Sequence, residues 1–277
     1  MKQKIFAKKT FGFILLILFI LITIFPFLWL IITSFKDPQD MSLMPTELWP
    51  SRFSLTHFYD AIYSHHLGVY LKNSVIVAIG TTILTIVIAL PSAYAFARLH
   101  FRFKTFWKNF ILLANMFPII AIVSPIFVMF KNWHILNTYL ALIIPSILIT
   151  LPMAIWTLIS FINTIPYELE EAAHMDGCGW FHTILSIVAP LAAPGIFTTA
   201  IIAFITAWNE FMFSLALVTR DEMRTVPVAI SMFPGQYTVP WGDMAAASVI
   251  STIPIVIVVL IFQKRIISGL TSGAVKG

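Results

Sequence analysis

The chain has 277 residues, of which 59% are hydrophobic and 10% are charged, and its mean hydropathy is +0.93. Soluble domains carry about 25% charged residues, so most of this chain is expected to lie in lipid. The net charge of +5 does not indicate a nucleic-acid partner, because the basic residues are few and lie mainly between apolar runs. A single cysteine, Cys178, and the lack of paired Cys or His spacing argue against a disulfide or a zinc site.

Hydropathy predicts the number of membrane spans. A helix that crosses the hydrocarbon core needs about 20 mainly apolar residues, because each residue adds about 1.5 Å to a core about 30 Å thick. Six segments meet this requirement, and they predict an all-α, polytopic membrane protein with six transmembrane helices. The predicted spans are Phe11–Thr33, Ser74–Ala97, Asn109–Phe130, Tyr139–Phe161, Pro194–Val218 and Met244–Phe262.

The Lys and Arg counts of the connecting segments predict the orientation of the chain. The N-terminal tail and the segment between the second and third spans hold four basic residues each, and the C-terminal tail holds three. The alternate segments hold three, one and two, so both termini are expected in the cytoplasm. One segment, 164–191, breaks the rule, because it should be cytoplasmic yet contains no Lys or Arg.

This exceptional segment is acidic at its start and apolar at its end. Its acidic residues are Glu168, Glu170, Glu171 and Asp176. Pro166 suits the first turn of a helix, and negative charge there favours the helix dipole. Gly177 predicts a stop, and apolar and aromatic residues follow from Trp180 at roughly helical spacing. We expect two short helices that meet at a glycine and dock on a protein, because membrane-surface helices usually carry Lys or Arg.

The same segment contains a spaced pattern of residues. The pattern is Glu171, Ala172, Ala173, three residues, Gly177, nine residues, Ile187 and then Pro190. It resembles the EAA loop of inner-membrane permease subunits of ABC importers, with Ala189 where that family usually has leucine. Other stretches are similar to the maltose-type carbohydrate subfamily: YLKNS at 70–74, AYAFARL at 93–99, WNEF at 208–211 and GLTSGAVKG at 269–277.

The resemblance runs from about Tyr70 to Gly277 and implies the type I ABC importer transmembrane fold in a bacterial inner or plasma membrane. It also implies three regions. Residues 1–68 would hold a cytoplasmic tail, the first span and an extracytoplasmic loop; 69–263 the transmembrane domain, with the EAA loop at 164–191; and 264–277 a cytoplasmic tail. The implied partners are a second homologous permease, two copies of a cytoplasmic ATPase, an extracytoplasmic sugar-binding protein and membrane lipid, with no nucleic acid.

By resemblance, two groups of residues are assigned to contact with the ATPase. The first, which we call the coupling residues, is Glu171, Ala172, Ala173, Asp176, Gly177, Ile187 and Pro190. The second, in the C-terminal tail, is Gly273, Ala274, Val275 and Lys276, for which a frayed terminus is the alternative. The chain has no GxxxxGK[ST] motif after a strand pattern, so ATP and Mg²⁺ are expected on the partner ATPase and no cofactor on this chain.

Few other polar residues are candidates for a function. Glu210 and Asn209 lie near the outer end of the fifth span and are the candidates for a substrate pathway or gate, with a structural or interfacial role as the alternative for Glu210. Asp243 is expected to be a charge at a helix start. His65, His66 and His174 have no carboxylate or cysteine partner at ligand spacing and are expected to be surface histidines.

The expected function is that of a permease subunit, not an enzyme, in an ATP-driven, binding-protein-dependent importer of a carbohydrate, with an oligosaccharide as the expected cargo. A permease of the same architecture for another solute, such as an amino acid, phosphate or a peptide, is the chief alternative, because only the tail and WNEF favour sugar. An ion-coupled secondary transporter would need intramembrane carboxylates or broken helices, and a membrane enzyme would need paired His, Asp or Glu within spans. Apart from Glu210, the predicted spans carry no carboxylate.

Overall fold

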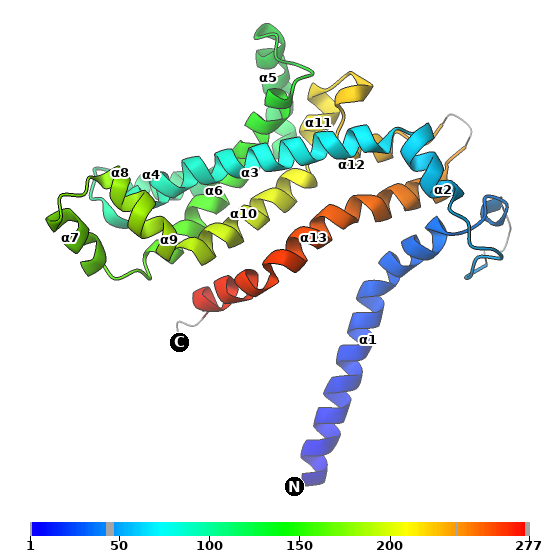
Figure 1. The fold of residues 1–277 in the computed structure, drawn as a ribbon, viewed down its shortest axis with the longest axis horizontal. Helices are drawn as coiled ribbons and strands as arrows, with labels where there is room; N and C mark the ends of the chain where they lie inside the picture. Colours follow the sequence, from blue (N-terminus) through cyan, green and yellow to red (C-terminus); the bar gives the residue numbers. More distant parts are fainter. Residues whose placement is uncertain (1, 43–46, 236–237, 275–277) are drawn as a thin grey trace. The chain divides into compact units, whose positions relative to one another are not determined.

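The computed structural model describes residues 2–42, 47–235 and 238–274, and these form helices and turns without a strand (Figure 1). Four helices are long and apolar enough to cross a membrane, and the number is up to six if each of two bent helix pairs is one span. The predicted all-α, multi-pass membrane architecture is therefore confirmed. The α-helices are α1 (Lys2–Ser34), α2 (Thr56–Tyr59), α3 (Leu67–Arg98), α4 (Lys104–Ala114), α5 (Ile119–Asn132), α6 (Tyr139–Ile162), α7 (Glu168–Met175), α8 (Trp180–Thr183), α9 (Ala189–Leu191), α10 (Ala193–Trp208), α11 (Met212–Leu217), α12 (Val226–Ser231) and α13 (Trp241–Ala274).

Short 3-10 or π-helical turns, labelled η, cover Asp40–Ser42, Asp60–Ser64, Ile184–Val188 and Asp221–Met223. The chain divides into two compact units. Unit 1 contains Met1–Leu67 and Ile230–Ile253, and unit 2 contains Gly68–Ala229 and Pro254–Gly277. The first part of α13 belongs to unit 1 and its remainder to unit 2.

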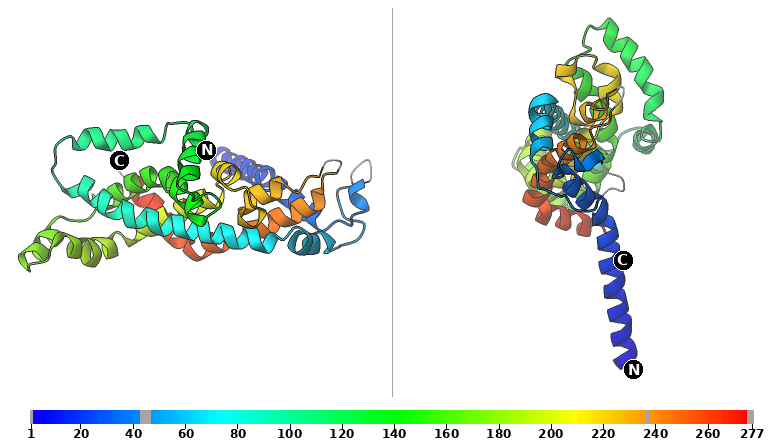
Figure 2. Two further views of the ribbon diagram at one scale, coloured as in Figure 1. Left: turned by 90° about the horizontal axis from the view of Figure 1, so that it is seen from above. Right: turned by 90° about the vertical axis from the view of Figure 1, so that its right-hand side faces the viewer.

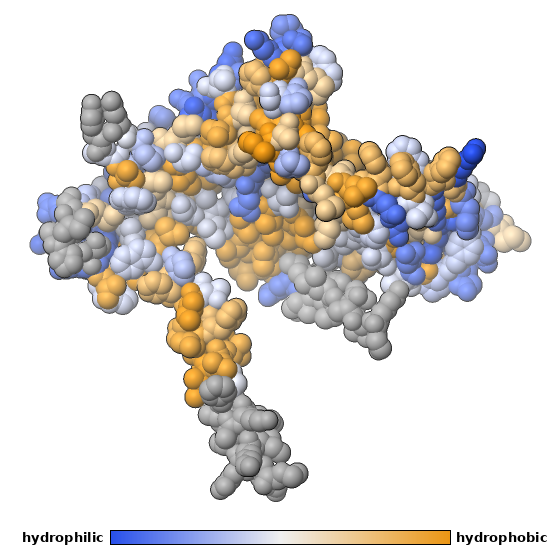
Figure 3. Space-filling model, turned by 180° about the vertical axis from the view of Figure 1, so that it is seen from behind, coloured by the Kyte–Doolittle hydropathy of each residue, from blue (hydrophilic) through white to orange (hydrophobic). Residues whose placement is uncertain are grey.

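Unit 1 contains a helix that buries almost nothing against its own chain. The apolar stretch Gly12–Ser34 of α1 has a mean hydropathy of 3.1, and none of its most apolar window is buried. The described part of α1 is hydrophobic over the face seen in Figure 3. The loop after α1 is fixed by polar contacts: Ser51 donates from its hydroxyl and its backbone N–H to the Asp40 carboxylate, and these bonds lower the pKa of Asp40.

Unit 2 is a layered arrangement of long helices, in which α3, α6 and α10 run beside one another (Figure 1). One core cluster joins α3 and α6 to the run 184–192, with Tyr94, Leu158 and Val188 almost completely buried. Inside this layer the hydroxyls of Thr85 on α3 and Thr150 on α6 hydrogen-bond at 2.7 Å. This bond satisfies the Thr85 hydroxyl, while Thr150 also bonds to the Ser146 carbonyl of its own helix at 3.0 Å.

The predicted spans are partly confirmed and partly corrected. The first, second and fourth lie within α1, α3 and α6, and the sixth lies within the longer α13. The third is wrong as one straight helix, because α4 and α5 meet at a bend of 93° (Figure 2). Pro118 explains the break: its backbone is extended, it has no N–H to donate, and a proline disfavours helical backbone in the residue before it.

The fifth predicted span, Pro194–Val218, is also interrupted. Helix α10 ends at Trp208, and the separate helix α11 begins only at Met212. At its other end, α10 continues from the run Trp180–Leu191 through a bend of 84°. Hydropathy alone therefore located the apolar residues correctly but not the points at which the helix breaks.

Candidate coupling site

The acidic segment forms the predicted pair of helices around a glycine. Helix α7 ends at Met175, and Gly177 has a φ of +84°, which is the left-handed region. The Gly177 N–H donates to the His174 carbonyl and the Cys178 N–H to the Ala173 carbonyl, both at 3.0 Å. These two bonds form a Schellman motif, which ends a helix and sets the direction of the chain that follows. One detail differs from the prediction, since Pro166 precedes the helix by two residues instead of lying in its first turn.

Most coupling residues lie on the surface of this element. Glu171, Ala172, Asp176, Gly177 and Pro190 are exposed. Ile187 is half-buried, in the π-helical turn that continues α8, and Ala173 is buried. An exposed acidic helix that ends in a fixed turn can contact a partner through its acidic face while the buried residues hold it to the membrane helices.

The sequence analysis missed the residue that anchors α7. Glu170 is completely buried, whereas Glu171 beside it is exposed. Tyr94 Oη donates to Glu170 Oε2 at 2.9 Å, and Arg98 Nε donates to Glu170 Oε1 at 2.7 Å. Arg98 Nη2 also donates to the carbonyls of Ile162 and Ile165, at 2.9 and 2.7 Å. Arg98 therefore joins the end of α3 to the end of α6 and to α7 at once.

A signal for this anchor exists in the sequence, although it is incomplete. Tyr94 and Arg98 are four residues apart and so lie on one face of a helix, which could present both donors to one acceptor. Nothing in the local sequence distinguishes Glu170 from Glu168 or Glu171 as that acceptor. The choice depends on how α7 packs against α3, and that is tertiary information.

His174 stabilises the glycine turn. Its Nδ1 lies 3.0 Å from the Cys178 carbonyl, so Nδ1 carries the proton and donates it. Its ring packs edge-on against Trp180, with centroids 4.6 Å apart, and Trp180 in turn contacts Tyr94. The expectation of a surface histidine is wrong for this residue, because His174 is half-buried and connects α7 to α8.

The other predicted site residues are placed as follows. Gly273 and Ala274 lie in the last turn of α13, and Val275 and Lys276 lie outside the described residues. Glu210 accepts hydrogen bonds from the backbone N–H groups of Phe213 and Ser214, at 2.7 and 3.1 Å, and so caps the start of α11. Asn209 donates to the Ile205 carbonyl at 2.9 Å. This geometry agrees with the structural role considered for Glu210, and the gating role stays a prediction.

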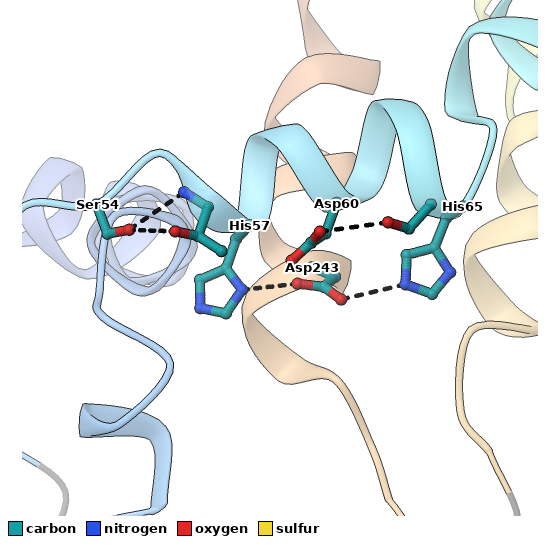
Figure 4. A network of polar contacts seen from close by, with 7 residues as sticks. Ser54, His57, Asp60, His65 and Asp243 are labelled. Carbon is teal, nitrogen blue, oxygen red and sulfur yellow. Dashed lines mark hydrogen bonds and ion pairs between the residues drawn. The ribbon is translucent and has the colours of Figure 1, made fainter.

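A polar network in unit 1 corrects the expectation for His65 and confirms and extends the one for Asp243 (Figure 4). Asp243, in the first turn of α13, lies 2.6 Å from His57 Nδ1 and 3.1 Å from His65 Nε2. His65 therefore has the carboxylate partner that its sequence neighbourhood lacks, and its ring stacks on Phe233 at 4.0 Å. Asp243 is the predicted charge at a helix start, and it also holds α2 and the turn that follows it against the start of α13. Its partners are 178 and 186 residues away in sequence, beyond the reach of a spacing argument.

The chain is similar to known transport proteins over most of its length. Residues 85–272 match the family described as "Binding-protein-dependent transport system inner membrane component". The chain is 42% identical over 264 residues to the trehalose/maltose transport system permease protein MalG of Thermococcus litoralis, with 94% of each chain covered. It is 38% identical to the trehalose transport system permease protein SugB of Mycobacterium tuberculosis, with 98% of each covered. It is 35% identical to the sulfoquinovosyl glycerol transport system permease protein SmoH of Agrobacterium fabrum, with 98% of this chain and 95% of that one covered.

A solved structure shares the fold. A chain in the crystal structure of a bacterial ABC transporter involved in the import of the acidic polysaccharide alginate superposes with a TM-score of 0.79 at 20% identity, covering 93% of this chain and 97% of that chain. The protein belongs to the family of inner-membrane components of binding-protein-dependent transport systems. The predicted resemblance to ABC importer permeases and the type I ABC importer transmembrane fold are confirmed.

Proposed function

We propose that this chain is the permease subunit of an ATP-driven, binding-protein-dependent importer of carbohydrates, and that it forms half of the translocation pathway. The names of its relatives support a sugar as cargo, since four of them are named as permeases of transport or uptake systems for trehalose/maltose, trehalose, sulfoquinovosyl glycerol and diacetylchitobiose. An oligosaccharide is the proposed cargo. The same architecture serving an amino acid, phosphate or a peptide is the second candidate, and the relatives' names weigh against it.

The observation that carries the proposed mechanism is the anchored helix α7. ATP hydrolysis is proposed to occur on two copies of a cytoplasmic ATPase, with ATP and Mg²⁺ bound there. Closure of that ATPase must be delivered to the spans through a rigid element. Helix α7 fits this role, because its outer face is exposed and acidic while the buried Glu170 is bonded to Arg98 and Tyr94 of α3. The coupling residues and the tail residues 273–276 are the proposed contacts.

The surface of α1 supports a second permease as partner. This helix is apolar and buries none of its most hydrophobic window against its own chain, so lipid or another apolar helix must cover it.

The proposed regions are 1–68, 69–263 and 264–277, with both termini and the segment 164–191 in the cytoplasm and an extracytoplasmic sugar-binding protein on the other side. Single cysteines test this orientation: in a Cys178→Ala background, an impermeant maleimide added to intact cells should label a cysteine at Ser51 and not one at Thr164. Equal labelling at both positions would contradict the orientation.

Uptake in cells tests the proposed function. Deletion of this gene should abolish uptake of at least one radiolabelled sugar from a panel of maltose, trehalose, cellobiose, diacetylchitobiose and digalacturonate, while uptake of phosphate and amino acids stays unchanged. The chain expressed from a plasmid should restore that uptake. Unchanged uptake of every sugar, together with loss of phosphate or amino-acid uptake, would overturn the proposal in favour of the second candidate.

A further inference from the structure

We infer that the start of α4 is a binding surface for an anionic phospholipid of the cytoplasmic leaflet. This surface, which we call the α4 patch, combines basic and aromatic residues of unit 2: Arg102, Phe103, Lys104, Phe106, Trp107 and Lys108. The inference rests on the proposed orientation of the chain and adds a lipid partner to the proposed function. It does not depend on which cargo is carried.

The positive charges of the α4 patch have no acidic partner in their own part of the chain. No Asp or Glu occurs in the sequence between Asp60 and Glu168. Arg102 is exposed, and Lys104 and Lys108 are half-buried. The structure records no ion pair for any of the three within its described ranges. An anion from outside this chain can therefore compensate these charges.

Contacts within the chain hold the three basic groups in place without neutralising them. Lys104 Nζ donates to the Leu99 carbonyl at 2.9 Å, just after the end of α3. Lys108 Nζ lies 4.4 Å from the centre of the Trp156 ring on α6. The Arg102 guanidinium lies 4.9 Å from the centre of the aromatic ring that follows it in the chain. Carbonyls and aromatic rings carry no net charge, so these contacts orient the cations and leave their charge available to an anion.

The aromatic residues of the α4 patch are exposed. Phe103, Phe106 and Trp107 are 63%, 60% and 48% exposed, and together they line an apolar hollow of about 240 Å³. No residue of α4 is buried. Aromatic rings beside Lys and Arg are typical of helices that contact lipid at the depth of the headgroups. Helix α7, which is acidic and carries no Lys or Arg, is the opposite case.

The α4 patch lies at the end of unit 2 that the Lys and Arg counts assign to the cytoplasm. The bond from Lys104 to Leu99 joins the start of α4 to the end of α3, and Arg98 in the last turn of α3 is paired with Glu170 of α7. Helices α4, α7 and α8 accordingly lie at the same end of unit 2 (Figure 1). Anionic lipids of the cytoplasmic leaflet attract Lys and Arg near the membrane surface. A phospholipid also covers the exposed rings, which a soluble anion would leave in water.

The proposed ATPase is the alternative occupant, because it would contact α7 at the same end. Two observations favour lipid. Two of the three cations in the α4 patch are lysines, and lysine is depleted in protein interfaces. Helix α4 is also half of a bent helix pair that is apolar enough to cross a membrane, so its start lies where a span meets the membrane surface.

Lipid preference at the α4 patch tests the inference. The complex of permeases and ATPase is prepared with Cys178→Ala and Thr105→Cys in this chain, because Thr105 is exposed beside the patch and can carry a fluorophore. It is placed in nanodiscs of phosphatidylcholine with a rising fraction of brominated phosphatidylglycerol, which quenches a nearby fluorophore. Brominated phosphatidylcholine gives the reference. We expect quenching at Thr105→Cys to show a preference of at least tenfold for phosphatidylglycerol.

Replacement of all three cations by glutamine removes the charge of the α4 patch. Each Lys or Arg near an anionic membrane surface contributes about fivefold to binding, so Arg102→Gln alone should lower the preference about fivefold. The triple variant, with Lys104→Gln and Lys108→Gln added, should abolish the preference. Exchange of each patch lysine for arginine and of Arg102 for lysine keeps the charge and should keep the preference within about threefold. This variant and Arg102→Gln decide the matter if the triple variant does not accumulate in the membrane.

The matched control removes three charges elsewhere on unit 2. Lys72→Gln, Lys131→Gln and Arg220→Gln together change exposed residues outside the α4 patch and lower the net charge by the same amount. The preference at Thr105→Cys should then stay within twofold of its reference value. Equal loss with the patch and control variants, or equal quenching by the two brominated lipids, would overturn the lipid site.

Two further outcomes would assign the α4 patch to another ligand and so overturn the inference. One is loss of the preference when inorganic phosphate is added, which would indicate a site for a soluble anion. The other is loss of the ATPase from the triple variant with an unchanged lipid preference, which would indicate a protein contact. Sugar uptake is not part of this readout, and maleimide labelling at positions 51 and 164 tests the orientation separately. Failure of the lipid site is therefore distinguishable from failure of the proposed function.

Discussion

Arg98 and Glu170 form an ion pair that connects the last turn of α3 to α7, with Arg98 Nε 2.7 Å from Glu170 Oε1. The side chains are 11% and 0% exposed, so solvent screens this pair far less than a surface pair. Removing one partner of a buried pair leaves the other charge uncompensated and typically costs about 3–5 kcal/mol. We therefore expect Arg98→Met to lower both the thermal stability of the purified complex and the retention of the ATPase.

Glu168→Gln is the control for this experiment, because Glu168 lies on the same helix and is exposed. It should change the unfolding midpoint little. The double variant Arg98→Met with Glu170→Met should be more stable than Arg98→Met alone, since no buried charge is then left unpaired. If Arg98→Met is as stable as Glu168→Gln, the ion pair does not hold α7 in place.

The network around Asp243 gives a second prediction. A Cβ added at Gly242 would collide with the ring of His57, which contacts Asp243. We expect Gly242→Ala to displace His57, to separate α2 from α13, and to destabilise unit 1 by about 1–3 kcal/mol, as overpacking usually does. Limited proteolysis of the loop 35–66 measures this separation.

Gly68→Ala is the matched control, because an added Cβ there meets nothing within 4 Å. The double variant Gly242→Ala with His57→Ala should regain part of the protease resistance, since the smaller side chain makes room. Cleavage of Gly242→Ala at the wild-type rate would show that the contact between His57 and Asp243 does not hold this loop.

The sequence predicts the number of apolar segments well for a physical reason. Spans are selected for length and apolarity, and both are visible residue by residue. The break at Pro118 cannot be recognised in this way, because proline is also common inside membrane helices, as Pro145 and Pro152 in α6 show. The break after Trp208 contains no proline at all. Whether a proline bends or ends a helix depends on which neighbours satisfy the freed backbone groups.

The candidate site was also predictable only where its features are local in the sequence. The glycine turn was predicted because Gly177 and its position after an acidic helix are local features. The burial of Glu170 and the pairing of His65 with Asp243 were not, because each depends on residues 72 to 178 positions away. A pattern of spacing detects residues that share one helix face, and these partners are on different helices.

The turn at Gly177 gives a third prediction. An added Cβ would meet nothing within 4 Å, so the cost of a substitution comes from the backbone alone. A β-branched residue at a φ of +84° costs about 1–3 kcal/mol and should redirect α8. We expect Gly177→Val to abolish sugar uptake and to weaken ATPase association while the subunit stays in the membrane.

Two variants make this prediction specific. Gly179→Val is the control, because Gly179 has a φ of −74° and equally open surroundings, so that uptake should persist. Gly177→Asn should keep part of the activity, since asparagine tolerates the left-handed region. Normal uptake by a stably expressed Gly177→Val protein would remove the turn from the coupling mechanism.

Glu171 gives the last prediction, which distinguishes docking on the ATPase from stabilisation of a helix start. Glu171 is exposed, and the structure records no ion pair for it within the described residues, so its charge is available to a partner. A charge at an exposed helix start contributes about 0.3–1 kcal/mol, whereas truncation of a buried charge pair at an interface costs about 2–5 kcal/mol.

Glu171→Gln keeps the shape of the side chain and removes its charge. We expect it to lose the ATPase during purification, with a loss that grows as salt is raised. Glu168→Gln, which removes an equal charge from the same helix start, should keep it. Co-purification of the ATPase with Glu171→Gln at wild-type yield over a range of salt would mean that Glu171 only stabilises α7, and equal loss with both variants would mean that Glu171 has no specific contact with the ATPase.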